Sequence, residues 1–127
     1  MKLRLQFNSI RLRLKRGEVD QLAKLGRVEE TIILGSSDDD LFVFAIESSP
    51  KIFATQVSLK KSHLLVEVPK EAAARWATGN DVGIETKLSV GGGRELQVLV
   101  EKDFACLNGT DEQNRDTFRN PLAGTKC

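Results

Sequence analysis

The chain has 127 residues, a formal net charge of +1, 40% hydrophobic residues and 29% charged residues. These values are typical of one globular domain and exclude a general electrostatic attraction to nucleic acid or membranes. The chain lacks both a run of roughly 20 apolar residues and the apolar core of a signal peptide, so we expect a cytoplasmic protein with no membrane partner.

The first half of the chain predicts two strands, a helix and two further strands. Residues 2–7 and 10–14 alternate between apolar and polar side chains, as strands with one buried face do, and Asn8-Ser9 between them predicts a tight turn. We expect the apolar members of this pair to point inward: Leu3, Leu5, Phe7, Ile10, Leu12 and Leu14. Residues 17–25 change to a helical period, with Val19, Leu22, Ala23 and Leu25 on one face. Two strands follow, at about 27–34 and 41–47.

The second half predicts the same order of elements. Strands are expected at about 53–59 and 64–68, followed by a helix over 70–77. Trp76 of this helix is expected in the core because it aligns with Leu22 of the first half. Strands at about 81–88 and 95–101 flank three consecutive glycines, Gly91 to Gly93, which suit a hairpin loop.

The two halves also align with each other. At an offset of 54 positions, apolar residues of 2–47 fall on apolar residues of 56–101; Leu12 falls on Val66 and Leu22 on Trp76. This repeat predicts an α+β, mainly β fold: two strand–strand–helix–strand–strand units, related by a pseudo-twofold axis, forming one closed or nearly closed barrel. The barrel domain would span residues 1–102, with halves of about 1–50 and 51–102, and residues 103–127 would form an irregular tail. We expect such a chain to be a monomeric pseudo-dimer.

Short motifs add two resemblances. Asn8-Ser9 followed by residues 10–14, and residues 68–71 followed by the box at 79–85, resemble the swapped-hairpin barrels of the AbrB and MazE class of DNA-binding regulators and antitoxins. That resemblance implies DNA contact by the first hairpin. Over its whole length the chain resembles a small group of uncharacterised bacterial proteins, through residues 8–11, residues 101–104 and Cys106. This second resemblance implies no activity.

Basic side chains are concentrated in the first hairpin. Its alternation places five of them opposite the apolar residues, and with the turn they form the predicted nucleic-acid-binding set: Lys2, Arg4, Asn8, Ser9, Arg11, Arg13 and Lys15. Such a face can neutralise phosphates or bind an acidic protein partner; the alternative is a solvated strand face that deters aggregation. At the offset of 54, Leu65, Glu67 and Pro69 replace Arg11, Arg13 and Lys15, which argues against twofold DNA recognition.

No catalytic residues, cofactor or metal are predicted. The tail offers Asp103, Cys106, Asp111, Glu112, Asp116 and Cys127 as metal ligands, but without the close ligand pairs that zinc sites usually show. A disulfide between the two cysteines is disfavoured in a reducing cytosol. Two other hypotheses stay open. The tail could wrap a partner protein through Phe104, Leu107, Phe118 and Leu122, or a cleft in the barrel could hold a small ligand or an enzyme site.

Overall fold

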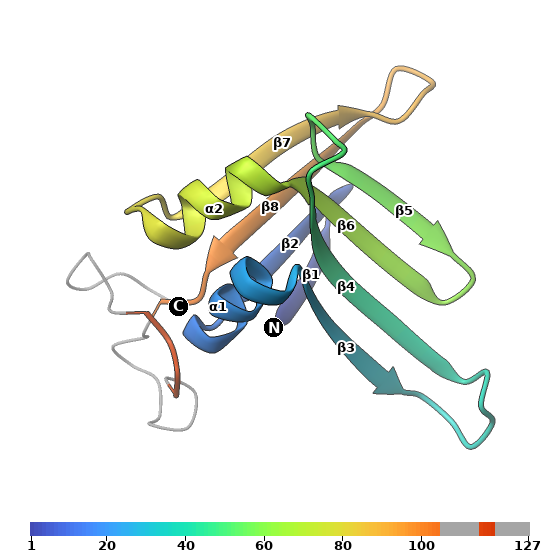
Figure 1. Cartoon of the computed structure of the whole chain (residues 1–127). Coiled ribbons are helices and arrows are strands. Elements are labelled where there is room, and N and C mark those ends of the chain that lie inside the picture. The colour runs from blue at the N-terminus through green and yellow to red at the C-terminus, as the bar shows by residue number, and fades with distance from the viewer. Residues whose placement is uncertain (105–114, 119–127) are drawn as a thin grey trace. The chain divides into compact units, whose positions relative to one another are not determined.

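The structure is a computed structural model that describes residues 1–104 and 115–118. Within these residues the predicted strands and helices are confirmed, with bounds that differ from prediction by three residues at most (Figure 1). The elements are β1 (Lys2–Gln6), β2 (Ser9–Leu14), α1 (Arg16–Leu25), β3 (Arg27–Ile33), β4 (Leu41–Ser49), β5 (Gln56–Lys60), β6 (His63–Pro69), α2 (Lys70–Thr78), β7 (Gly83–Ser89) and β8 (Glu95–Lys102).

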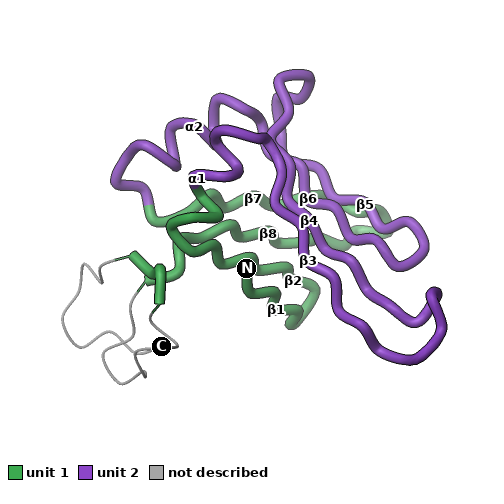
Figure 2. The backbone as a smooth tube through the Cα atoms, turned by 60° about the horizontal axis from the view of Figure 1, so that its bottom comes forward, with its two compact units in different colours: residues 1–19, 82–127 green, residues 20–81 purple. Residues whose placement is uncertain are grey.

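The chain divides into two compact units, coloured separately in Figure 2. Of the described residues, the first unit contains 1–19, 82–104 and 115–118. Its sheet has the strand order β1-β2-β8-β7, in which the central strands β2 and β8 are parallel and each outer pair is an antiparallel hairpin.

The second unit contains residues 20–81. Its sheet has the order β3-β4-β6-β5, again with a parallel central pair and two antiparallel outer pairs. Helix α2 contacts β4 and β6 of this sheet. Among the described residues, no helix is both long enough and apolar enough to cross a membrane.

The predicted barrel is wrong. The strands form two separate four-stranded sheets, and neither sheet closes, because β1, β7, β3 and β5 each pair with a single neighbour. Closure requires each outer strand to exchange backbone hydrogen bonds with a second strand, and within the described residues none of these four does so. The alternating sequence pattern specified which face of a strand is buried but not which strand lies beside it.

The buried faces follow the predicted periodicity in the central strands and depart from it at the edge. Ile10, Leu12 and Leu14 are buried as expected, as are Val98 and Val100 on the same side of β8. In contrast, Leu5 is 60% exposed and Phe7 is 92% exposed, so the prediction that they point into a core is wrong. They lie at the end of the edge strand β1 and in its turn, where side chains have a neighbouring strand on one side only.

The helices bury narrow apolar stripes. In α1, Val19 and Leu22 are buried, but Ala23 and Leu25, predicted for the same face, are exposed. In α2, Trp76 is only 1% exposed, which confirms its predicted place in the core.

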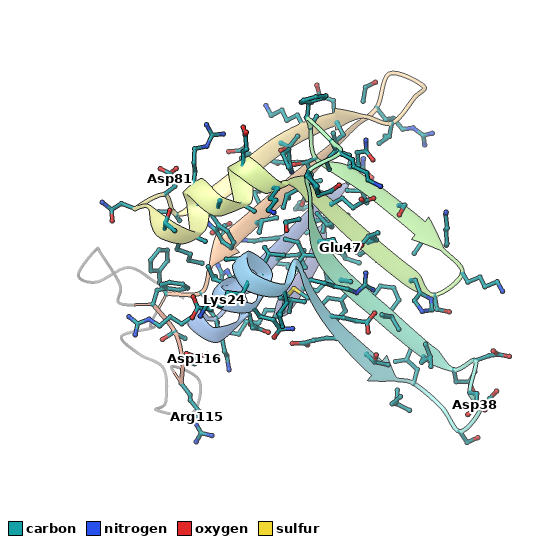
Figure 3. The ribbon with its side chains drawn as sticks, in the orientation of Figure 1. Lys24, Asp38, Glu47, Asp81, Arg115 and Asp116 are labelled. Atoms are coloured by element: carbon teal, nitrogen blue, oxygen red, sulfur yellow. The ribbon has the colours of Figure 1, made fainter. Side chains whose placement is uncertain are left out.

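Segment 115–118 is part of the first unit and supplies the cap of α1. The residue before the helix is Lys15, whose side chain cannot accept the hydrogen bond of an N-terminal amide. Asp116 takes that role: its Oδ2 accepts from the amide of Gly17 at 3.0 Å, and its carbonyl accepts from the amide of Arg16 at 2.8 Å. Figure 3 shows Asp116 beside the start of α1, with the side chain of Arg115 pointing away.

Aromatic packing also holds this segment. The rings of Phe104 and Phe118 meet edge to face, with centroids 6.1 Å apart, and the amide of Phe118 donates to the carbonyl of Asp103 at 2.8 Å. The cations of Lys102 and Arg16 lie 5.5 Å and 5.9 Å from the centroid of the Phe118 ring, within the range of cation–π attraction.

Candidate anion-binding face

Four of the five cations predicted from the sequence lie on β1 and β2 at one edge of the first sheet, and the fifth is the residue that follows β2. We call Lys2, Arg4, Arg11, Arg13 and Lys15 the cationic strip. In the β1–β2 hairpin, Lys2 lies opposite Arg13 and Arg4 lies opposite Arg11, so these four side chains share the face opposite Leu12 and Leu14. Like charges placed directly opposite each other destabilise a strand pair. The strip therefore has an electrostatic cost that carboxylates or a bound anion would relieve.

Part of that cost is relieved within the protein. Arg11 donates to Glu101 through both arms of its guanidinium, with Nε–Oε1 and Nη2–Oε2 distances of 2.7 Å and 3.1 Å. The two residues are brought together because β2 and β8 are parallel neighbours. Arg13 lies directly opposite Glu101, and Arg11, two positions earlier on β2, reaches the same carboxylate diagonally. Arg11 is thus held in a two-pronged ion pair, the geometry in which arginine binds carboxylates most strongly.

Lys2 has a second internal partner. Its Nζ lies 3.1 Å from Oδ2 of Asp103, a carboxylate whose side chain is only 5% exposed. The oxygen makes no hydrogen bond of good geometry, so this contact is an ion pair held by charge rather than by a directed bond. Lys2 itself is exposed, and most of its charge faces solvent.

Three members of the strip have no carboxylate partner in the described part of the chain. Arg4, Arg13 and Lys15 make no salt bridge there. Arg4 is exposed, whereas Arg13 and Lys15 are half-buried. The structure therefore leaves three cations of the predicted five available for an external anion.

A shallow hollow of about 320 Å³ lies on this face. Its lining combines the paired Arg11 and the unpaired Arg4 with Gln6, Ser9, Leu99 and Glu101. The lining has hydrogen-bond donors and one apolar side chain but no aromatic ring. A site without aromatic rings offers no platform on which nucleic-acid bases stack, so it suits contact with a charged backbone better than contact with bases.

The predicted turn residues serve the hairpin itself. The turn is centred one residue earlier than predicted, on Phe7 and Asn8, which both have positive φ angles. The Asn8 side-chain amide donates to the carbonyl of Glu95 at 2.6 Å, and the Ser9 hydroxyl donates to the carbonyl of Gln6. Both side chains are therefore already engaged with backbone groups.

The other half of the same face is acidic. Glu85 on β7 and Glu101 on β8 lie on the side of the sheet that carries the strip, and Gln97 donates to Glu85 at 2.7 Å. Sequence reasoning missed Glu101 and Asp103 as partners of the strip. The available signal was the acidic end of the last strand, but its pairing with residues about 90 positions earlier could not be deduced from spacing.

The remaining predicted elements give no second site. No group of three or more potential metal ligands occurs among residues 1–104 and 115–118. Asp103 and Asp116 are engaged as described above, and Cys106, Asp111, Glu112 and Cys127 lie outside the described residues, as do Leu107 and Leu122.

Comparison with known proteins gave one match. A family model described as "Family of unknown function (DUF7009)" matches residues 1–122. This finding confirms the predicted likeness of the whole chain to an uncharacterised family, and it gives no support to the AbrB/MazE resemblance or to the duplication inferred with it. No curated protein and no solved structure matched the chain.

Proposed function

The chain belongs to DUF7009, a family of unknown function, and we propose that it is a non-enzymatic binding module whose cationic strip holds nucleic acid by its phosphates. One observation carries the proposal: Arg4 and Arg13 each lie opposite another cation and have no carboxylate partner among the described residues. A row of phosphates would relieve the repulsion that these pairs create.

The same geometry limits what is recognised. Carboxylates at Glu85 and Glu101 occupy the other half of the face and would repel phosphates placed there. The second unit does not repeat the strip, because Leu65 and Glu67 stand on β6 where Arg11 and Arg13 stand on β2. The proposed contact is therefore narrow, involves the backbone of the nucleic acid, and discriminates weakly between sequences.

The test is the salt dependence of binding, measured by fluorescence anisotropy with labelled duplex DNA. Each neutralised phosphate contributes a slope of about −0.9 to log K against log salt, so three unpaired cations predict a slope of about −2.7 for the natural chain. Arg4→Gln with Arg13→Gln should reduce the slope to about −0.9 and weaken binding at low salt. Scrambled duplex sequences should bind equally well.

The matched control removes two cations elsewhere. Lys60→Gln with Lys61→Gln changes net charge by the same amount at the β5–β6 turn, where both side chains are exposed. Equal weakening by the two double variants, or no binding by the natural chain at low salt, would disprove the proposal. Tighter binding of polyglutamate than of DNA would replace it with the acidic-partner alternative.

A further inference from the structure

A groove in the second unit has chemistry unlike that of the cationic strip. It lies between residues 49–53, which begin at the last residue of β4, and the first two turns of α2, and we call it the α2 groove. Ser49 and Pro69 are the last paired residues of the neighbouring strands β4 and β6. The two chain segments leave the sheet at that level and diverge, which leaves a hollow of about 490 Å³. This volume lies within the range of small-molecule sites.

One wall of the groove is apolar. Phe53 is 100% exposed, so its ring contributes no burial to the folded chain. Pro50, Ile52 and the small side chains Ala72 and Ala74 complete the apolar surface beside it. An apolar ligand in the hollow would remove this large, fully exposed aromatic ring from water, and that burial favours binding.

The polar part of the lining carries a net positive charge. Lys70 and Arg75 both line the groove, and neither makes a salt bridge among the described residues. Glu71 is the carboxylate in the lining and stands four residues before Arg75, yet no ion pair joins them. Two cations against one carboxylate leave one positive charge unbalanced. Arginine and lysine at the border of an apolar hollow are suited to hold a carboxylate.

We propose that the α2 groove binds a small amphipathic monoanion, with the apolar body of the ligand against Phe53 and its carboxylate held by the cations that line the groove, Lys70 and Arg75. The inference does not depend on the nucleic-acid proposal, because it uses other residues in another unit. An apolar body alone would satisfy the Phe53 wall but leave the cations without a partner. An anion without an apolar body would leave the ring exposed.

The experiment titrates the full chain with three probes that share one apolar body: phenylbutyrate, phenylbutanol and phenylbutylamine. Binding is followed by amide chemical shifts in two-dimensional NMR, which identify the binding site and give the affinity. We expect saturable shifts confined to residues 49–53 and 69–75, with phenylbutyrate binding most tightly and phenylbutylamine most weakly. Shifts spread over both units, or equal affinity for the anion and the alcohol, would overturn the proposal.

Two variants separate the contributions. Phe53→Ala should weaken phenylbutyrate binding about fivefold to tenfold, and should fold normally because the ring is exposed in the native chain. Lys70→Gln with Arg75→Gln should abolish the preference for phenylbutyrate over phenylbutanol. Leu59→Ala, which removes an exposed apolar side chain of the same unit, and Lys60→Gln with Lys61→Gln, which removes two exposed cations, are matched controls that should change neither affinity. Unchanged binding by Phe53→Ala would also overturn the proposal.

Discussion

Arg11 and Glu101 form a two-pronged ion pair between β2 and β8, across 90 positions of sequence. The side chains are 30% and 13% exposed, so the pair is partly shielded from solvent and fixed in place. Arg11 therefore lies in the cationic strip, but its charge is already paired with Glu101 and is not available to an external anion. The carboxylate acts on the strip as an internal competitor of any external anion.

Removing that competitor should strengthen nucleic-acid binding. Glu101→Gln leaves a side chain of the same shape and releases the guanidinium of Arg11 to contact a phosphate. The slope of log K against log salt should become steeper by about 0.9. Asp38→Asn removes the same charge from the exposed loop between β3 and β4 in the other unit and serves as the control, since Asp38 makes no salt bridge in the described residues. An equal effect of both variants would mean that net charge alone sets binding.

The cap supplied by Asp116 makes α1 depend on a segment about 100 positions away. Asp116→Ala removes the acceptor from the Gly17 amide and puts alanine at a φ of 57°. We expect the free energy of unfolding to fall by about 1–2 kcal/mol. Asp116→Asn should cost less, because asparagine keeps an acceptor and tolerates positive φ. The measurement is urea unfolding followed by circular dichroism.

The neighbouring Arg115 provides the control for this prediction. Its side chain is exposed, and Arg115→Ala should change stability by less than about 0.5 kcal/mol. A loss for Arg115→Ala as large as that for Asp116→Ala would show that the segment matters through something other than the cap.

Sequence periodicity was sufficient to identify the elements and the buried positions of the central strands. Ile10, Leu12 and Leu14 alternate with polar neighbours, so local pattern identified them as buried. Trp76 was expected in the core from its alignment with Leu22, not from a local pattern. The same alternation placed Lys2 and Arg4 on the face shared by Arg11 and Arg13, which is the face they occupy.

Strand partners could not be predicted in this way. The alternation in residues 2–7 gives no information on whether β1 has one neighbour or two, so the exposure of Leu5 and Phe7 was missed. The parallel pairing of β2 with β8 joins distant segments, and it alone brings Glu101 to Arg11. Charge pairing in the candidate site depended on this long-range contact, which residue spacing does not encode.

Arg27 in the second unit should stabilise the fold by a constant amount over the neutral and alkaline range. Its guanidinium contacts Glu29 at 2.7 Å and Glu47 at 3.0 Å. The hydrogen bond to Glu29, with the charge of Glu47, outweighs partial burial and raises the pKa of Arg27 above its usual value. For a base with a raised pKa, the stabilisation is present below the pKa of the unfolded chain and is lost only as the pH rises through the still higher folded value.

Arg27→Gln should therefore lower the free energy of unfolding by the same amount at about pH 6 and about pH 10. The cost should be no more than about 1 kcal/mol, because the three side chains are partly exposed, and it should shrink at high salt. Lys24→Gln, which breaks the exposed pair with Asp20, is the control and should have almost no effect. A cost that disappears by about pH 10 would contradict the assigned shift.

Substitution of Trp76 tests how much the packing of α2 contributes to the stability of the second unit. The side chain is 1% exposed, so Trp76→Ala should leave a large cavity and lower the free energy of unfolding by about 3–5 kcal/mol. Because this is the one tryptophan of the chain, unfolding must be followed by circular dichroism instead of fluorescence. Leu25→Ala removes a side chain that is 77% exposed and should cost less than about 0.5 kcal/mol.

The turn of the β1–β2 hairpin should become more stable when its first residue is changed. Phe7 and Asn8 have φ angles of 48° and 58°, the left-handed region that two-residue hairpin turns require and that asparagine tolerates better than phenylalanine. The Phe7 ring is 92% exposed, so Phe7→Asn removes strain without removing packing and should raise the free energy of unfolding by about 0.5–1 kcal/mol. Asn8→Ala should act in the opposite sense, because it puts alanine in the same strained region and breaks the 2.6 Å bond to the Glu95 carbonyl. A loss of stability in Phe7→Asn would contradict this prediction, because it would mean that the Phe7 ring contributes packing that its exposure does not indicate.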